Sequence, residues 1–171
     1  MSARAAPVTT TRAAVLFVCM GNICRSPTAQ GVFRALVARE WPDATLVVDS
    51  AGTHDYQIGE FPNADAVAAA KRRGFYIPHH RARQIVAEDF QRFDWILAMD
   101  QRNLDVLAEL CPMDFRGHLG LLLDFAPELG TREVPDPYYG AAPDFDEALR
   151  LIEGGTLRLL DAIRTRSAAS R

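Results

Sequence analysis

The chain has little cysteine and almost no lysine. Three cysteines in 171 residues are an odd number and too few for the disulfide framework of a small secreted domain, so we expect a reducing, cytoplasmic setting. Lys71 is the only lysine, but arginines bring the basic residues to 19, against 22 acidic ones. A net charge of −3 gives no reason to expect nucleic acid or an anionic membrane as a partner.

Long hydrophobic runs are missing as well. No apolar run reaches the ~18 residues of a membrane-spanning helix, which argues against membrane insertion. Residues 1–12 contain arginine, serine and threonine but lack the apolar segment of a secretory signal. We predict a disordered leader there, with a short transit peptide as the alternative, and a flexible tail at 166–171. Secretion by a route that needs no signal peptide stays open.

The remaining sequence alternates short apolar segments with amphipathic ones. Residues 13–19 form a continuous β-branched and aromatic run, which is typical of a strand covered on both faces. Further strands are predicted at 44–50, 93–99 and 117–125, and helices at 26–40, 63–74, 103–111 and 144–164. This alternation predicts one α/β domain over residues 13–165, with a parallel sheet and helices on both faces.

Single residues refine the predicted helices. Asn63 is a favourable N-cap for the second helix, and Gly74 is a favourable stop signal. Gly154 and Gly155 are expected to weaken the last helix. Cys111 follows apolar residues at helical spacing, so we expect it in the core.

Two of the three cysteines lie in one short loop, CMGNICRS, at residues 19–26. The loop joins the carboxyl end of the first strand to the first helix, where open α/β sheets bind their ligands. We expect Ser26 to cap this helix and Pro27 to be its first residue. Gly21 and Asn22 tolerate the positive φ angles that turn successive N–H groups inward. The loop therefore predicts an anion site of the size of a phosphate group.

The side chains of this loop suggest a nucleophile. Arg25 offers a planar fork that holds two oxygens of a tetrahedral anion at once. The positive field that binds phosphate also stabilises a thiolate, which makes Cys19 a nucleophile directed at phosphorus. A zinc site is disfavoured, because the spacing of Cys19 and Cys24 matches no common zinc motif and no further Cys or His pair completes a set. A purely structural pair of thiols remains the alternative.

A second stretch, EVPDPYYG at 133–140, supplies an acid. Asp136 lies between two prolines, in a segment that can form neither a helix nor a central strand. Tyr138 and Tyr139 follow it, so the carboxyl group is flanked by aromatic walls that suit a flat phosphorylated ring. The alternative is an ordinary Asp-Pro turn with packed tyrosines. A leaving phenolate needs a proton, and Asp136 is our candidate for the general acid.

Taken together, these stretches resemble the low-molecular-weight protein tyrosine phosphatases, including the bacterial members. The sequence contains, in this order, VLFVCMGNICRSPTAQ, DSAGT, HRARQI, FDWILAMD and DPYYG. The resemblance runs from about residue 13 to the last helix and implies a flavodoxin-like, three-layer domain with a four-stranded parallel sheet. It also implies that Cys19 forms a phosphocysteine, that Arg25 clamps the phosphate, and that Asp136 acts as acid and then as base. Neither a metal nor another cofactor is implied.

The resemblance also assigns supporting residues. It implies a phosphate-binding loop that contains Met20, Gly21, Asn22, Ile23, Cys24 and Ser26. Asn22, Ser50 and His80 match positions whose hydrogen bonds hold this loop, and Ser26 would donate to the Cys19 thiolate. Tyr56, Tyr138 and Tyr139 match the walls of the substrate pocket.

Several of these roles have alternatives. Ser50 could be only a strand-end cap, and His80 only a surface histidine. Asp100 is either a supporting acid or a helix cap. The resemblance suggests that Cys24 protects an oxidised Cys19 by forming a disulfide with it, whereas the alternative is a passive buried side chain.

The expected partner is a phosphotyrosine-containing protein, with a bacterial tyrosine kinase as one candidate. We expect a monomer, with a weak dimer as the alternative. Ile23 offers an apolar wall to a phenyl ring, whereas relatives that act on phosphoarginine carry threonine there. Met20 is a departure from the family, because many bacterial relatives carry threonine or leucine at this position.

A thioredoxin-coupled arsenate reductase would need two further cysteines, and only Cys111 remains. A non-catalytic phosphotyrosine-binding module is disfavoured because nucleophile, clamp and acid are all present.

Overall fold

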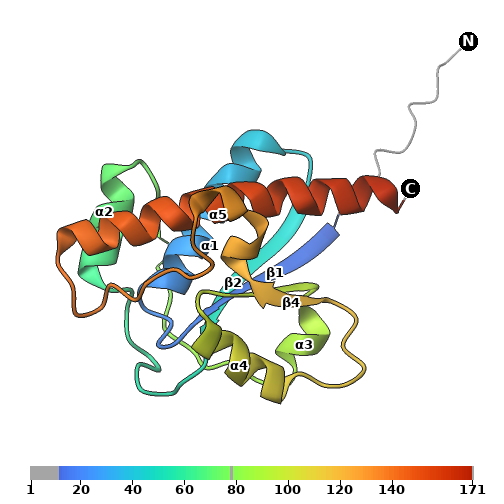
Figure 1. Ribbon diagram of the computed structural model, residues 1–171, viewed down its shortest axis with the longest axis horizontal. Coiled ribbons are helices and arrows are strands. Elements are labelled where there is room, and N and C mark those ends of the chain that lie inside the picture. Colours follow the sequence, from blue (N-terminus) through green and yellow to red (C-terminus); the bar gives the residue numbers. More distant parts are fainter. Residues whose placement is uncertain (1–11, 78, 171) are drawn as a thin grey trace, which may run out of the picture.

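The computed structural model describes residues 12–77 and 79–170 (Figure 1). Most of the predicted leader lies outside the described residues, and Arg12 is the first residue of a strand. The strands are β1 (Arg12–Cys19), β2 (Thr45–Gly52), β3 (Trp95–Ala98) and β4 (His118–Leu121). They form a four-stranded sheet in the order β2-β1-β3-β4, and every pair is parallel. The predicted α/β fold with a four-stranded parallel sheet is confirmed.

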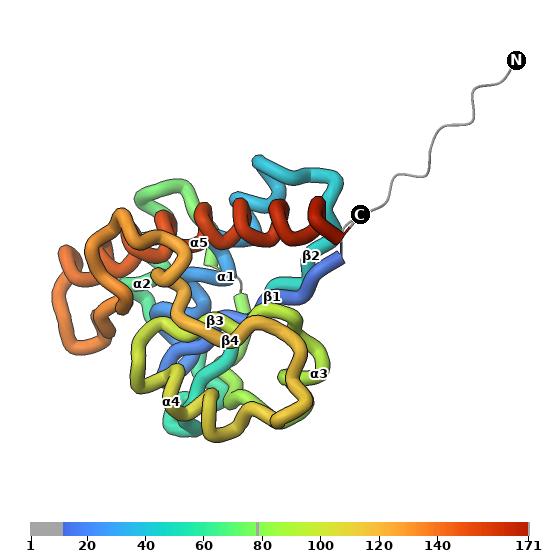
Figure 2. The backbone as a smooth tube through the Cα atoms, turned by 45° about the vertical axis from the view of Figure 1, so that its right-hand side comes forward, coloured from blue at the N-terminus to red at the C-terminus, as the bar shows by residue number. Residues whose placement is uncertain are grey.

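Helices cover both faces of this sheet. They are α1 (Arg25–Glu40), α2 (Ala64–Arg72), α3 (Asp89–Arg92), α4 (Gln101–Leu110) and α5 (Ala142–Ala169). In Figures 1 and 2, α1, α2 and α5 lie on one face, and α3 and α4 lie on the other. The result is the three-layer arrangement that a run of alternating strands and helices favours.

The central strand β1 explains why the sequence shows an uninterrupted apolar run. Val15 and Phe17 pack in the core beneath α1 and α5, whereas Leu16 and Val18 pack in the core beneath α3 and α4. Successive side chains of a strand point to opposite faces, so a strand covered on both sides needs apolar residues at every position. All four side chains are fully buried.

The fourth strand is shorter than predicted. The sequence predicted a strand over 117–125, but β4 ends at Leu121 and the chain continues as a 3₁₀ turn, Leu122–Phe125. Leu122 and Leu123 both pack into the core on the α5 side. Neighbouring residues of a strand cannot face the same side, so the turn is what allows both to be buried there. The third strand, predicted at 93–99, is likewise shorter than expected.

The predicted last helix is present, and α5 runs without a break through Gly154 and Gly155. A Cβ atom added at Gly155 would lie 2.8 Å from Cδ2 of Leu123 and 2.9 Å from Cγ of Leu122. The glycine thus allows the 3₁₀ turn to approach the helix closely. The helix also continues to Ala169, past the predicted domain end at residue 165.

The predictions for Asn63, Gly74 and Cys111 differ in how well they agree with the structure. Asn63 caps α2 as predicted, because its side-chain oxygen accepts hydrogen bonds from the N–H groups of Asp65 and Ala66. Gly74 follows this helix with a φ angle of +80°. Cys111, expected in the core, terminates α4 and is only partly buried, against the cluster of apolar side chains beneath α3 and α4.

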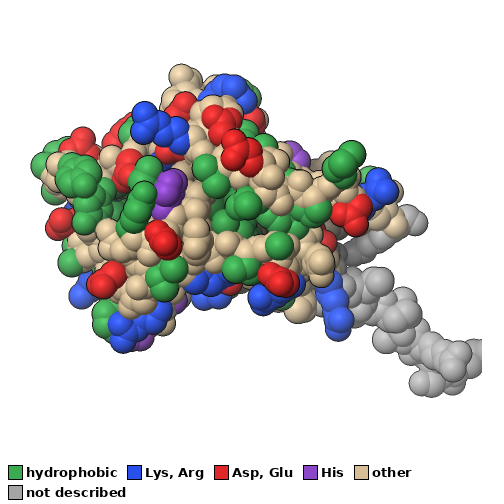
Figure 3. Space-filling model, turned by 90° about the horizontal axis from the view of Figure 1, so that it is seen from below, with side chains coloured by type: hydrophobic (Ala, Val, Ile, Leu, Met, Phe, Trp, Pro, Cys, Tyr) green, Lys and Arg blue, Asp and Glu red, His purple; other side chains and the backbone are tan. Residues whose placement is uncertain are grey.

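The surface mixes charges with apolar side chains. Figure 3, which shows the molecule from below, displays acidic and basic side chains interspersed with hydrophobic ones. Within residues 12–77 and 79–170, no helix is both long enough and apolar enough to span a membrane.

Gly31 of α1 offers a test of this packing. A Cβ atom at this position would collide with the carbonyl oxygen of Tyr76 and lie 3.1 Å from Cα of Ile77. Alanine gains ~1 kcal/mol of helix propensity over glycine, but overpacking against backbone costs about 1–3 kcal/mol. We expect Gly31→Ala to lower the free energy of unfolding by about 1 kcal/mol, measured by urea denaturation.

A matched control lies on the exposed side of the same helix. Ala35→Gly makes the reverse change at a solvent-facing position and should cost ~1 kcal/mol through propensity alone. If Gly31→Ala were as stable as the wild type, the close approach of the 75–77 segment would not constrain α1.

Candidate active site

The 19–26 loop connects β1 to α1, and the helix begins earlier than predicted. Arg25 is its first residue, and Cys24 precedes it without a side-chain capping bond. The prediction that Ser26 caps the helix is therefore wrong. The Ser26 hydroxyl faces the loop instead, where its Oγ lies 3.0 Å from Sγ of Cys19. A hydroxyl held this close can stabilise a thiolate.

Asn22 shapes the loop. Its φ angle of +58° is the only positive one among the non-glycine residues of the described chain, and Gly21 does not share it. The backbone N–H of Asn22 donates to Sγ of Cys19 at 3.3 Å. Its side-chain nitrogen donates to Oγ of Ser26 at 2.9 Å and to Oγ of Ser50 at 3.0 Å. Of the two residues predicted to turn the loop inward, only Asn22 has the positive φ angle. Ser50 contacts Asn22, as predicted.

Arg25 is buried, and several groups hold its guanidinium. One nitrogen donates to Oδ2 of Asp100 at 2.6 Å and to the carbonyl of Val134 at 3.0 Å. The other lies 3.3 Å from Oδ2 of Asp136. Burial lowers the pKa of Arg25, but the negative charges of Cys19, Asp100 and Asp136 outweigh it and raise the pKa. The Nε atom is buried and has no hydrogen-bond partner among the described residues.

Asp100 combines the two roles that the sequence left as alternatives. Its Oδ1 accepts the N–H of Asn103 at 2.8 Å and so caps α4. Its Oδ2 binds Arg25. One carboxylate therefore ties the start of α4 to the start of α1.

A pocket of about 270 Å³ opens above the loop. It is lined by Cys19, Met20, Gly21, Ile23, Cys24, Arg25, Tyr56, Gln57, Asp136, Tyr138 and Tyr139. Tyr56 and Tyr139 are largely exposed, at 74% and 97%, whereas Tyr138 is 39% exposed. Asp136 turns back on its own segment, because its Oδ1 accepts the N–H of Tyr138 at 3.2 Å. The structure thus gathers the predicted nucleophile, clamp, acid and aromatic residues around one pocket.

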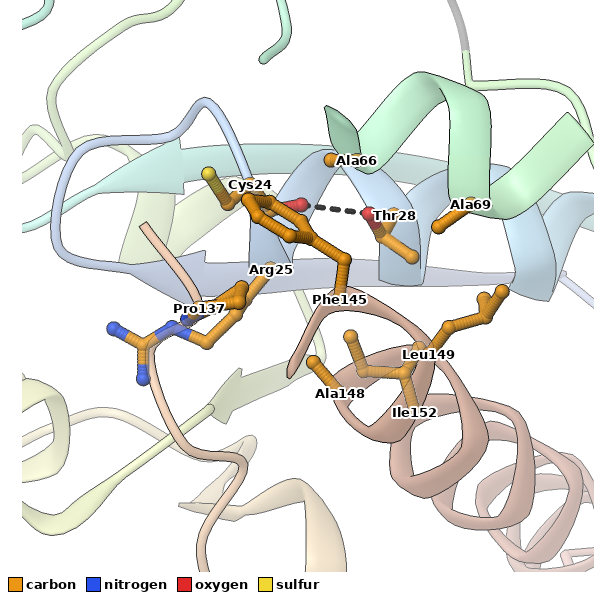
Figure 4. A pocket seen from close by; sticks show the side chains of 10 residues that line it. All are labelled: Cys24, Arg25, Thr28, Ala66, Ala69, Pro137, Phe145, Ala148, Leu149 and Ile152. Carbon is orange, nitrogen blue, oxygen red and sulfur yellow. Dashed lines mark hydrogen bonds between the residues drawn. The ribbon is translucent and has the colours of Figure 1, made fainter. Parts of the chain in front are cut away.

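Cys24 lines this pocket and also a small neighbouring cavity, where it lies next to apolar side chains of α2 and α5. Figure 4 shows side chains of α1, α2 and α5 converging on a cavity of about 10 Å³, among them Thr28, Ala66 and Phe145. Thr28 donates to the carbonyl of Cys24 at 2.7 Å. Burial, followed by the charges of Cys19 and Asp136, raises the pKa of the Cys24 thiol to about 12.

Three residues at the site were missed by the sequence analysis. Gln30 accepts a hydrogen bond of 2.6 Å from the Ser50 hydroxyl, Gln57 lines the pocket, and the backbone N–H of Arg83 donates to Oδ1 of Asn22 at 3.0 Å. Gln30 and Arg83 lie in the motifs SPTAQ and HRARQI, but only the folded chain reveals their contacts. His80 is half-buried, and its role in holding the loop stays a prediction.

The described residues, 12–77 and 79–170, contain no group of three or more His, Cys, Asp or Glu side chains that could hold a metal ion. The groups that converge on the pocket are those of an anion site: a helix N-terminus, a buried arginine and the N–H of Asn22, which donates to the Cys19 sulfur. A cysteine at the floor of such a site, in a parallel α/β domain, defines the class of cysteine-dependent phosphatases.

Comparison with known proteins narrows this class. The family model "Low molecular weight phosphotyrosine protein phosphatase" matches residues 14–169. The chain belongs to this family and is accordingly a phosphoric monoester hydrolase.

Individual relatives agree with this assignment. The low molecular weight protein-tyrosine-phosphatase YfkJ of Bacillus subtilis is 37% identical over 150 residues, which cover 88% of this chain and 95% of that protein. Its crystal structure matches with a TM-score of 0.84 over 92% of this chain and 98% of that one, at 35% identity. The low molecular weight phosphotyrosine protein phosphatase of Gallus gallus is 42% identical, over 77% of this chain and 84% of its own.

A third relative was solved with a ligand. Wzb of Vibrio vulnificus, in complex with benzylphosphonate, matches with a TM-score of 0.74 and 29% identity, over 88% of this chain and 98% of that one.

The environment of Cys24 generates a prediction about its reactivity. A buried thiol with a pKa of about 12 is almost fully protonated at pH 7, and the thiol form reacts slowly with alkylating agents. We expect iodoacetamide at pH 7 to modify Cys24 at least tenfold more slowly than the partly exposed Cys111, as measured by peptide mass spectrometry. In urea the two rates should become equal. Equal rates in the folded protein would contradict the burial of Cys24.

Proposed function

We propose that Cys19, Arg25 and Asp136 hydrolyse phosphotyrosine in two steps through a phosphocysteine. The observation that carries the proposal is the environment of the Cys19 sulfur. It accepts the N–H of Asn22, lies 3.0 Å from the Ser26 hydroxyl, and shares a pocket with Arg25 and Asp136. These contacts favour a thiolate, which is the attacking form of cysteine.

In the first step, the Cys19 thiolate forms a bond to phosphorus while the bond between phosphorus and the phenolic oxygen breaks. Asp136, as the carboxylic acid, gives its proton to the departing phenolate. The position of Asp136 supports this role, because Asp136 lines the same pocket as Cys19.

In the second step, water attacks the phosphocysteine. Asp136, now a carboxylate, accepts a proton from this water, and the bond between sulfur and phosphorus breaks to release inorganic phosphate. The Ser26 hydroxyl and the Asn22 N–H stabilise the departing thiolate, as they would the free one.

Arg25 is proposed to bind two oxygens of the phosphate group in both steps. Its buried Nε has no partner among the described residues, and its position at the first turn of α1 adds the positive end of the helix dipole. The benzylphosphonate complex of the Vibrio vulnificus relative supports a phosphonate-sized anion attached to an aromatic ring as the ligand of this loop.

The walls of the pocket support phosphotyrosine as the substrate. Tyr56, Tyr138 and Tyr139 form aromatic sides, and Ile23 and Met20 add apolar surface at the loop. A phenyl ring can pack between these groups, whereas the short side chain of phosphoserine cannot extend across them. We propose a phosphotyrosine-containing protein as the partner, with a bacterial tyrosine kinase as one candidate.

Cys24 is proposed to protect the nucleophile. Peroxide would oxidise the Cys19 thiolate to a sulfenic acid, and attack by the Cys24 sulfur would form a disulfide and release water. The three cysteines are unpaired in the structure, as the proposed resting form in a reducing cytoplasm requires.

The arsenate reductase alternative finds little support in the position of Cys111. Cys19 and Cys24 belong to the core beneath α1 and α5, whereas Cys111 packs against the core beneath α3 and α4. A disulfide relay needs sulfurs that can meet, and here the sheet separates them.

Steady-state kinetics test the proposed mechanism. The substrates are p-nitrophenyl phosphate and peptides with phosphotyrosine, phosphoserine or phosphoarginine, without added metal. We expect selective turnover of the phosphotyrosine peptide, no turnover by Cys19→Ser, and a kcat for Asp136→Asn that is roughly 10²- to 10⁴-fold lower.

Asp43→Asn is the matched control, because it makes the same change at an exposed aspartate outside the pocket, and its kcat should equal that of the wild type. Undiminished kcat in Asp136→Asn would remove that residue from the mechanism, and arsenate reduction by the wild type would replace the proposed reaction.

A further inference from the structure

The left-handed backbone of Asn22 needs support from outside the loop. This conformation is unfavourable for a residue with a side chain, yet it directs the N–H of Asn22 at Cys19. Oxygens of Ser26 and Ser50 accept from the side-chain nitrogen. The side-chain oxygen is bound by the backbone N–H of Arg83, far away in the chain. The position of the Arg83 backbone therefore helps to decide the orientation of the Asn22 amide.

Backbone hydrogen bonds hold the Arg83 segment against the end of β2. Gly52 donates to the carbonyl of Arg83 at 2.8 Å, and Ile85 donates to the carbonyl of Gly52 at 2.8 Å. Gly52 in turn touches the loop, because an added Cβ there would lie 2.6 Å from the carbonyl oxygen of Met20. The segment and the loop thus pack on the same glycine.

The Arg83 side chain fixes this segment in place. Its guanidinium forms a two-pronged contact with Asp89, at 2.9 and 3.1 Å, and a further contact of 3.1 Å with Asp49. Asp89 is fully buried and also accepts the N–H of Val86 at 2.9 Å. A buried carboxylate that is matched by a planar fork gives a rigid attachment, which lysine at this position could not reproduce.

We infer that Arg83, anchored by Asp89 and Asp49, is a positioning residue that holds Asn22 and thereby shapes the phosphate site. The inference rests on the proposed function of the loop and adds to it a specific dependence on a side chain that does not line the pocket. Arg83 acts through its backbone N–H on Asn22, and its guanidinium, together with the backbone bonds to Gly52, holds that N–H in position.

The test separates the side chain from the backbone. Arg83→Met keeps the N–H that contacts Asn22 but removes the guanidinium. We expect the dissociation constant for inorganic phosphate, measured by titration calorimetry, to rise about tenfold, which corresponds to 1.4 kcal/mol. The kcat for p-nitrophenyl phosphate should fall by a similar factor. Arg83→Lys, which keeps the charge but not the fork, should recover only part of the phosphate affinity.

Two control variants distinguish positioning from general stability. Arg158→Met removes an exposed ion pair with Glu128, far from the loop in sequence, and should leave phosphate affinity unchanged. Ile163→Ala truncates a buried side chain of α5 and should lower the melting temperature without changing phosphate affinity well below that temperature. Loss of phosphate affinity in Ile163→Ala equal to that in Arg83→Met would reduce Arg83 to a structural residue.

A double-mutant cycle tests the route through Asn22. Glycine accepts the φ angle of +58° but has no amide, so Asn22→Gly removes the group that Arg83 is inferred to hold. In that background, Arg83→Met should change phosphate affinity by less than twofold. A full tenfold effect there, or no effect of Arg83→Met alone, would overturn the inference. Binding of phosphate is measured without turnover, so failure of this test is distinct from failure of the proposed reaction.

Discussion

Arg25 is buried, and much of the site depends on how its charge is matched. A guanidinium stays protonated at any pH that proteins experience, so burial requires acceptors within the fold. They come from the end of β3 and from the 133–140 segment, which are distant from α1 in the chain. Val134 is itself attached to the end of β3, because its N–H donates to the carbonyl of Met99 at 2.8 Å. The 19–26 loop and the 133–140 segment are consequently assembled around one cation.

The parallel sheet brings these parts together. The carboxyl ends of parallel strands lie at one edge, and here β1, β2 and β3 deliver Cys19, Gly52 and Asp100 to that edge. Each strand end is followed by groups that hold the loop or its arginine. Small residues permit the close contacts, since Gly52 leaves no Cβ against the loop backbone. The loop is therefore held by sheet packing as well as by its own hydrogen bonds.

Sequence reasoning located most of the fold because apolar periodicity reports burial directly. The uninterrupted apolar run of β1 and the Asn63 cap of α2 are local signals, and both lead to the observed elements. The end of β4 could not be read in this way, since three successive leucines suit a strand and a 3₁₀ turn equally well. Likewise, Gly154 and Gly155 weaken an isolated helix, and only the neighbouring leucines explain their presence in α5.

In the site, too, residues in local motifs could be predicted from the sequence, whereas contacts between residues far apart in the chain could not. Cys19, Arg25 and Asp136 lie in motifs with clear chemical character, and the structure brings them to one pocket. The expectation that Ser26 caps α1 failed, whereas its expected contact with Cys19 is present at 3.0 Å. Gln30 and Arg83 act through contacts with residues far away in the chain, which no local pattern encodes.

Asp100 gives the domain a thermodynamic link between helix formation and anion binding. One oxygen of this carboxylate caps α4, and the other holds the guanidinium that faces the pocket. Fraying of the first turn of α4 frees the carboxylate to move, which loosens Arg25, and a bound anion that orders Arg25 opposes that fraying. By mass action, we expect an anion that binds Arg25 to protect the amide hydrogens at the start of α4 from exchange, although this helix does not line the pocket.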